Sequence, residues 1–156
     1  MGAGWGGFAV VGNYAITQEQ RGAQECVNCY DVNNGKLLWS HQDVVRFSEV
    51  LGGDGPRATP TIEDGRVYAL GATGILNCLE GETGKSVWTR DTLKELGQLN
   101  LEWGKSSSPL VTGDLVIVTL GHPNPADTKD RPKFSSVVVA FDRTSGKLVW
   151  KSGEDH

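Results

Sequence analysis

The sequence lacks the features that mark a membrane-spanning, disulfide-stapled or nucleic-acid-binding protein. No apolar run approaches the ~20 residues that cross a bilayer, and the segment 1–5 has neither the basic region nor the apolar run of a signal peptide. The three cysteines, Cys26, Cys29 and Cys78, are too few and odd in number for a disulfide framework. Net charge is −4, with 15 basic and 19 acidic residues and no basic run, so we expect no nucleic-acid partner.

Motifs for the common site chemistries are also missing. No Gly-x-Ser-x-Gly occurs, and the three histidines are scattered, so hydrolysis has no support. The segment 2–7 matches Gly-x-Gly-x-x-Gly, but no strand precedes it and a strand instead of a helix is expected after it. Cys26 and Cys29 are three apart in a predicted strand, where they point to opposite faces, and no second cysteine pair exists. We therefore expect no catalytic residue and no metal site.

Glycine, in contrast, is abundant, and it recurs at fixed places. The chain has 21 glycines in 156 residues, which predicts many tight turns. The segments 29–39, 78–88 and 140–150 nearly superimpose. Each has a small residue, an acid two positions later, Gly-Lys, and a tryptophan four residues after the glycine. Such a repeat indicates one supersecondary unit used three times.

Each unit predicts four β-strands. Short β-branched and aromatic runs, broken by Gly, Asn and Asp, precede each copy of the motif and read as strands joined by tight turns. The repeats extend over about 6–42, 57–92 and 105–153. Trp88 follows Trp39 by 49 residues and Trp150 follows Trp88 by 62, with the excess at 121–134. This spacing predicts an all-β fold of β-propeller blades. A flat β-sandwich is the alternative, but it does not explain why the tryptophan recurs.

The motif resembles the tryptophan-docking motif of pyrroloquinoline-quinone (PQQ) type β-propellers. The third copy matches best, while the second has Glu80 for Asp and the first two have Cys29 and Cys78 for Ala. This superfamily includes quinoprotein alcohol dehydrogenases and the propeller lipoprotein of the bacterial outer-membrane assembly machine, and also bacterial PQQ-like repeat proteins. The positions that match the structural motif are Asp31, Gly35, Trp39, Glu80, Gly84, Trp88, Asp142, Gly146 and Trp150.

The resemblance implies structural roles for these positions. Each tryptophan is expected to stack on a neighbouring blade, each glycine to supply a positive φ in a turn, and each acid to accept turn amides. Closed propellers have about four to eight blades, which hides the blade faces. Three blades therefore predict either a fragment of a longer propeller or association of copies. We favour a dimer, which makes a six-bladed ring.

Long segments are predicted to gather at one end of the blades. Because strand direction alternates, the segments 18–25, 43–56, 93–104 and 121–134 all fall at that end, where binding usually resides. Three cations there, Arg21, Arg57 and Lys105, can hold an anion, a carboxylated quinone or an acidic peptide, or can be ordinary solvated charges. Trp103 can stack on a ligand or anchor its loop. The candidate binding residues are Glu19, Arg21, Arg57, Trp103, Lys105 and His122.

Two hypotheses about function follow. The first is a non-catalytic scaffold that binds a protein or peptide through this long-loop face. The alternative is a fragment of a PQQ-dependent quinoprotein oxidoreductase, an alcohol or sugar dehydrogenase that uses PQQ with calcium. The sequence has no adjacent cysteine pair and no residue that matches the family's catalytic base, so we expect no cofactor. The resemblance also implies a bacterial periplasmic or cell-envelope location.

Overall fold

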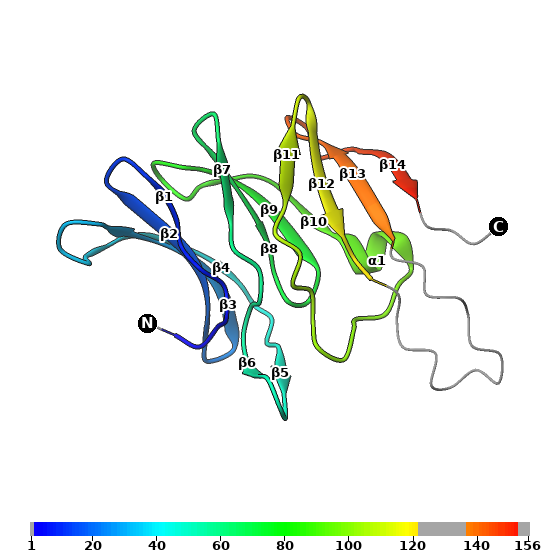
Figure 1. The fold of residues 1–156 in the computed structure, drawn as a ribbon, viewed down its shortest axis with the longest axis horizontal. Coiled ribbons are helices and arrows are strands. Elements are labelled where there is room, and N and C mark those ends of the chain that lie inside the picture. The colour runs from blue at the N-terminus through cyan, green and yellow to red at the C-terminus, as the bar shows by residue number, and fades with distance from the viewer. Residues whose placement is uncertain (1, 122–136, 153–156) are drawn as a thin grey trace.

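The structure, a computed structural model, describes residues 2–121 and 137–152. Within these ranges three four-stranded antiparallel sheets follow one another along the chain. Figure 1 shows the sheets standing side by side as an open row that does not close into a ring. The fold is therefore all-β and built of propeller-like blades, as the sequence predicted.

Each blade pairs its strands in chain order. Blade 1 consists of β1 (Ala9–Val11), β2 (Tyr14–Arg21), β3 (Gln24–Asp31) and β4 (Leu37–Asp43). Blade 2 consists of β7 (Thr61–Glu63), β8 (Arg66–Leu70), β9 (Ile75–Glu80) and β10 (Ser86–Asp91). Blade 3 consists of β11 (Leu110–Thr112), β12 (Leu115–Thr119), β13 (Val138–Asp142) and β14 (Leu148–Ser152). The connections between blades carry a small hairpin, β5 (Ser48–Glu49) and β6 (Gly53–Asp54), and one helix, α1 (Thr92–Leu96).

The turn between the third and fourth strand of each blade follows the predicted chemistry. Gly35, Gly84 and Gly146 have φ of 70°, 70° and 68°, a conformation that side chains with a Cβ rarely adopt. The Asp31 carboxylate accepts from a turn amide, that of Asn33, at 2.7 Å. The Asp142 carboxylate likewise accepts from the amides of Thr144 and Ser145. Glu80 differs, because its carboxylate accepts from the Thr83 hydroxyl instead.

The hydrophobic core lies between the blades. Alternate side chains of a strand point to opposite faces, so each sheet offers one apolar set to each neighbour. Blades 1 and 2 share the cluster Ile16, Val27, Cys29, Trp39, Val67, Ala69 and Leu79. Blades 2 and 3 share a larger cluster that includes Tyr68, Leu76, Trp88, Val116, Val139 and Phe141. Since burying each large apolar side chain contributes about 1.5–3 kcal/mol, the stability of each blade depends on the blade beside it.

One tryptophan fastens each pair of neighbouring blades. The Trp39 indole nitrogen donates to the Gly81 carbonyl of blade 2 at 3.0 Å, and a Cβ on Gly84 would overlap the Trp39 ring. Trp88 repeats this contact one blade further along: its indole donates to the Arg143 carbonyl at 3.0 Å and its ring lies against Gly146. Both tryptophans are 9% exposed. The ring needs a glycine beneath it, because any side chain there would occupy its place.

Two expectations about the connections need correction. The segment 18–25 is not a long loop: β2 and β3 run through it and meet in a tight turn at Gly22, where φ is 58°. The segment 93–104 is not wholly irregular, because it begins with α1. The Asp91 carboxylate caps this helix by accepting from the Lys94 amide, and Gly97 ends it with φ 63°. The predicted elaboration at 121–134 lies outside the described residues except for Gly121.

The cysteines are structural. Cys26, Cys29 and Cys78 are buried and carry free thiols, which confirms that no disulfide framework supports the fold. Burial raises the pKa of Cys29 to about 11, so this thiol stays protonated at neutral pH and packs as a small apolar side chain.

Two glycines with the same backbone conformation test the tryptophan contact. Gly35 and Gly84 both have φ of 70°, but only Gly84 lies beneath a tryptophan ring. At protein concentrations where the chain is monomeric, Gly84→Ala should lower the free energy of unfolding by about 2 kcal/mol more than Gly35→Ala, because only the first methyl group then forces a ring to move. Urea unfolding followed by tryptophan fluorescence measures both losses. Equal losses would show that the Trp39 ring does not rest on Gly84.

Candidate functional site

Most of the irregular connections gather at one end of the blades, which we call the loop end. It contains the β2–β3 and β8–β9 turns, the β5–β6 hairpin and the segment 97–109, at the bottom of Figure 1. Hydrogen bonds fasten these parts together: Arg46 donates to the Gly22 carbonyl at 2.7 Å, and Asn100 donates to the Ala72 carbonyl at 3.1 Å. The loop end is therefore a built surface held on a rigid scaffold, a usual setting for binding.

A shallow hollow at the loop end lies between two exposed tryptophans. Trp5, Gly52, Arg57 and Trp103 line it, and its volume is about 230 Å³. Trp5 is 69% exposed and Trp103 is 50% exposed. The Trp5 indole donates to the Gly52 carbonyl at 2.5 Å, which fixes this side chain against the β5–β6 hairpin. Two indole rings on fixed backbone form an apolar surface with little conformational freedom to lose on binding.

Arg57 holds this hollow together. Its guanidinium donates to the Gly52 carbonyl at 2.9 Å and to the Gly53 carbonyl at 3.0 Å, and makes a longer contact of 3.5 Å with the Trp103 carbonyl. It also lies 5.2 Å from the centre of the Phe47 ring, a cation–π distance. Arg57 thus joins the β5–β6 hairpin to the loop that carries Trp103.

The structure brings together Arg57 and Trp103 of the six predicted binding residues. Lys105 is 1% exposed, and its ammonium donates to the Leu120 carbonyl inside the protein. Burial lowers the pKa of Lys105 to about 8, because the charged ammonium loses water around it. The ammonium of Lys105 therefore points away from any ligand at the surface. His122 lies outside the described residues.

The outer face of blade 1 is the face turned away from blade 2. Glu19 and Arg21 lie on this outer face and form an ion pair of 3.2 Å. Glu19 is buried and accepts from the Tyr30 hydroxyl and the Gly2 amide. Burial works to raise the pKa of Glu19, but these two hydrogen bonds and the Arg21 charge outweigh it, so the pKa lies below its usual value. Glu19 is thus a buried anion that joins the segment before β1 to the sheet.

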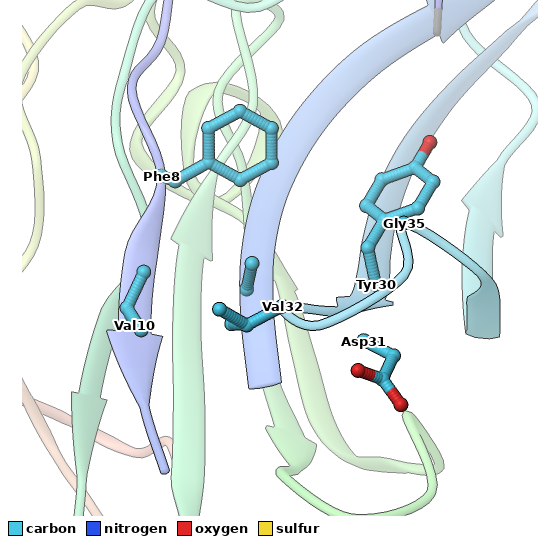
Figure 2. Close-up of a pocket in the computed structure, with 7 residues that line it drawn as sticks. Phe8, Val10, Tyr30, Asp31, Val32 and Gly35 are labelled. Carbon is cyan, nitrogen blue, oxygen red and sulfur yellow. The ribbon is translucent and has the colours of Figure 1, made fainter. Parts of the chain in front are cut away.

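The outer face of blade 1 also carries a hollow of about 570 Å³. Figure 2 shows Phe8 and Val10 on one side of it and Tyr30, Val32 and Gly35 on the other. The Phe8 and Tyr30 rings meet edge to face at 6.5 Å. Sequence reasoning found Gly35 through the repeat, but it missed Phe8, Val10 and Trp5, because none of them occupies a repeated motif position.

Glu25 is a buried titratable group near the loop end, between blades 1 and 2. Its carboxylate accepts from the Ala72 amide of blade 2 at 3.1 Å. Burial raises the pKa of Glu25 to about 7; the Ala72 amide opposes this shift, and the nearby Asp43 charge adds to it. Asp43 is itself held by Asn77, which donates to it at 2.6 Å, and by His41 at 3.5 Å.

Two general searches of residues 2–121 and 137–152 gave negative results. No helix in these ranges is long and apolar enough to cross a membrane. No three or more His, Cys, Asp or Glu side chains in the same ranges are placed to hold a metal ion together.

The repeated four-stranded blades, each fastened to the next by a tryptophan, define a β-propeller repeat protein. The profile of the family described as outer membrane protein assembly factor BamB matches residues 2–153, and the chain belongs to this family of PQQ-like propeller repeats. BamB of Marinobacter adhaerens (strain DSM 23420 / HP15) is 25% identical over 119 residues, which are 76% of this chain and 22% of that protein. The chain therefore spans less than a quarter of the length of that relative.

Solved structures show the same fold. The quinohemoprotein alcohol dehydrogenase of Comamonas testosteroni matches with a TM-score of 0.66 and 20% identity, over 97% of this chain and 21% of that one. A europium-containing methanol dehydrogenase matches with a TM-score of 0.66 and 18% identity, over 96% and 24%. BamB of Moraxella catarrhalis matches with a TM-score of 0.54 and 18% identity, over 93% and 50%. At these identities the likeness concerns the fold alone.

The raised pKa of Glu25 predicts how stability changes with pH. Because the folded state holds this proton more tightly than the unfolded state, whose pKa is near 4.5, the free energy of unfolding should fall as pH rises from about 4.5 to 7. Glu25→Gln keeps an acceptor for the Ala72 amide and removes the charge. At pH 8 this variant should be more stable than the wild type by up to about 3 kcal/mol.

Denaturant unfolding at a series of pH values measures this effect. Glu102→Gln, on the exposed part of the 97–109 segment, is the control, and it should leave the pH profile unchanged. A Glu25→Gln variant with the pH profile of the wild type would contradict the prediction.

Proposed function

We propose that this chain is a non-catalytic propeller module that binds a protein or peptide segment at its loop end and associates with copies of itself through its end blades. The observation that carries the first part is that Trp5, Trp103 and Arg57 line the same hollow. Tryptophan and arginine are the residues most enriched at the centre of protein–protein interfaces. A rigid hollow of about 230 Å³ accommodates one apolar side chain of a bound segment.

The polar contacts of the loop end favour an apolar ligand group over an anion. Arg57 donates to backbone carbonyls of the protein, Lys105 is buried, and Arg21 pairs with Glu19. None of the three cations that the sequence suggested for an anion is therefore left with its full charge directed to a ligand. We infer that the bound segment inserts an aliphatic or aromatic side chain between the two indoles, while its backbone contacts the polar rim.

Family membership supports a protein as the partner. The curated relative and one of the solved structures are named as assembly factors of the outer membrane or as BamB. By the same reasoning, we assign this chain to the periplasm or cell envelope of a bacterium.

The quinoprotein alternative finds no matching donor set in the described residues. PQQ enzymes use a calcium or lanthanide ion beside the quinone, and such ions need several oxygen ligands. No group of three or more carboxylates, histidines or cysteines in residues 2–121 and 137–152 is placed to supply them. We therefore propose that the chain binds neither PQQ nor its metal.

Removal of one indole should weaken binding at the loop end. Peptides enriched from a displayed random library on the immobilised wild type should share an apolar or aromatic position. Trp103→Ala should weaken their binding at least about 30-fold, the effect of losing an interface hot spot. Fluorescence anisotropy measures the dissociation constants. Trp150→Ala, which removes an exposed tryptophan elsewhere, is the control and should bind as the wild type does.

Added PQQ and calcium should leave the protein unchanged. The expected result is an unaltered midpoint of thermal unfolding, since a ligand that binds the native state raises it. Dye-linked oxidation of ethanol and glucose should stay at the background rate. A raised midpoint together with alcohol- or sugar-dependent dye reduction would restore the quinoprotein alternative.

A further inference from the structure

The contact that joins the blades has a donor half and an acceptor half. The donor half is the tryptophan of the fourth strand, seen in Trp39 and Trp88. The acceptor half is a glycine beneath the ring and a carbonyl three residues before that glycine, seen in Gly84 with Gly81 and in Gly146 with Arg143. The structure contains this contact twice, with the same atoms each time, so its geometry is known.

Blade 1 carries an acceptor half with no tryptophan on it. Gly35 has the same φ as Gly84, and a Cβ placed on it meets nothing within 4 Å. Val32 holds the position of Gly81 and Arg143, three residues before the glycine. These two residues belong to the lining of the hollow of about 570 Å³, which Figure 2 shows between β1 and the β3–β4 turn. The hollow therefore lies where the repeat places the indole of a preceding blade.

A buried amide on the same face is also unpartnered. Asn28 is 0% exposed and lies two residues before Tyr30, so both point to the outer face of blade 1. It lies near the Glu19 carboxylate and helps to lower the pKa of Glu19, but neither its amide nitrogen nor its amide oxygen makes a hydrogen bond of ordinary geometry. At the same position of blade 2, Asn77 donates to Asp43 of the preceding blade at 2.6 Å. Among the described residues, Asn28 has no counterpart of this contact.

Blade 3 carries a donor half whose acceptor is not among residues 2–121 and 137–152. Trp150 is 38% exposed, against 9% for Trp39 and Trp88. Its neighbours Leu148 and Val149 are also exposed. The acceptor and the donor lie at opposite ends of the row of blades, as Figure 1 shows for β1 and β14.

We infer that blade 1 of one copy accepts Trp150 of a second copy, with the indole ring on Gly35 and its N–H donating to the Val32 carbonyl. This inference rests on the self-association in the proposed function and specifies its atoms. A second copy is the occupant because the described residues offer one exposed motif tryptophan, Trp150, and one uncovered motif glycine, Gly35. The Val32 carbonyl lies three residues before Gly35, which is the spacing of the acceptor carbonyl and the glycine in the two internal contacts. The contact is heterologous, head to tail, and two such contacts close a dimeric ring when the rotation from one copy to the next is 180°.

Two variants each remove one half of the contact. Trp150→Ala removes the donor. Gly35→Asn introduces a residue that, like glycine, tolerates positive φ, and it places a side chain where the ring should lie. Sedimentation velocity over a concentration series should show a wild-type dimer, and each variant should weaken self-association at least about 30-fold.

Matched controls exist for both changes. Gly22→Asn repeats the second substitution at a glycine with φ of 58° and nothing within 4 Å of a Cβ, at the other end of β2. Leu99→Ala removes a different exposed apolar side chain. Both controls should associate as the wild type does, and unfolding in urea verifies that all four variants are folded.

An equimolar mixture of the two variants distinguishes this arrangement from a symmetric contact. Gly35→Asn keeps its donor and Trp150→Ala keeps its acceptor, so one head-to-tail contact can form between them. The mixture should give heterodimers that do not assemble further. A fluorescent label on one variant detects them. If the same face of two copies met instead, mixing the two variants would not restore association.

The outcomes separate this inference from the proposed function. A wild type that stays monomeric overturns both the inference and the proposed self-association. The blade 1 acceptor would then bind a blade other than blade 3 of a second copy. Peptide binding is tested independently. A wild type that dimerises while both variants dimerise equally well overturns the inference alone. Variants that fail alone and fail to pair in the mixture also overturn it.

Discussion

The structure depends on the contact between an indole ring and a glycine of the next blade. A four-stranded sheet has two faces, and a blade of this chain buries neither of them within itself, because its apolar side chains point alternately to the blade before it and the blade after it. The Trp39 and Trp88 rings add a polar bond to this apolar packing, since each indole donates to a carbonyl of the next blade. That bond has one direction, so it fixes the register between sheets that side-chain packing alone leaves free to slide.

Features that depend on local sequence were predictable, and those that depend on distant partners were not. The motif places its acid, its glycine and its tryptophan within eleven residues, so the repeat defined the blades and their turns. The segment 18–25 was predicted to be one of the long connections between strands. Its strands are nevertheless buried, since Gln18 donates to the Ala58 carbonyl at 2.9 Å and Gln20 donates to the Val45 carbonyl at 3.1 Å. Carbonyls that lie 25 and 40 residues away along the chain supply these partners, and no local pattern indicates them.

The same difference explains the candidate site. Sequence reasoning located Arg57 and Trp103 because both stand in connections between blades. It could not foresee that Arg57 donates to the carbonyls of Gly52 and Gly53, or that the Lys105 ammonium is buried against the Leu120 carbonyl. Loop carbonyls that would otherwise lack a partner take up the donors of these cations. The cations of the loop end are consequently engaged within the protein, and its two exposed indoles are the side chains most open to a ligand.

The outer face of blade 1 differs from the corresponding faces of the other blades in a way that bears on assembly. Where blade 2 has Ala69 and Leu79, and blade 3 has Val118 and Phe141, blade 1 has Thr17 and Tyr30. The Tyr30 side chain is only partly buried, so its hydroxyl loses water if a second blade covers it, which opposes the gain from burying the ring. The Thr17 hydroxyl already donates to the Gly7 carbonyl at 3.0 Å, and the Tyr30 hydroxyl donates to Glu19, so this face tolerates exposure better than its two counterparts would. A contact made on it between copies is therefore weaker than the two internal contacts, and a blade that can remain uncovered can also exchange its neighbour.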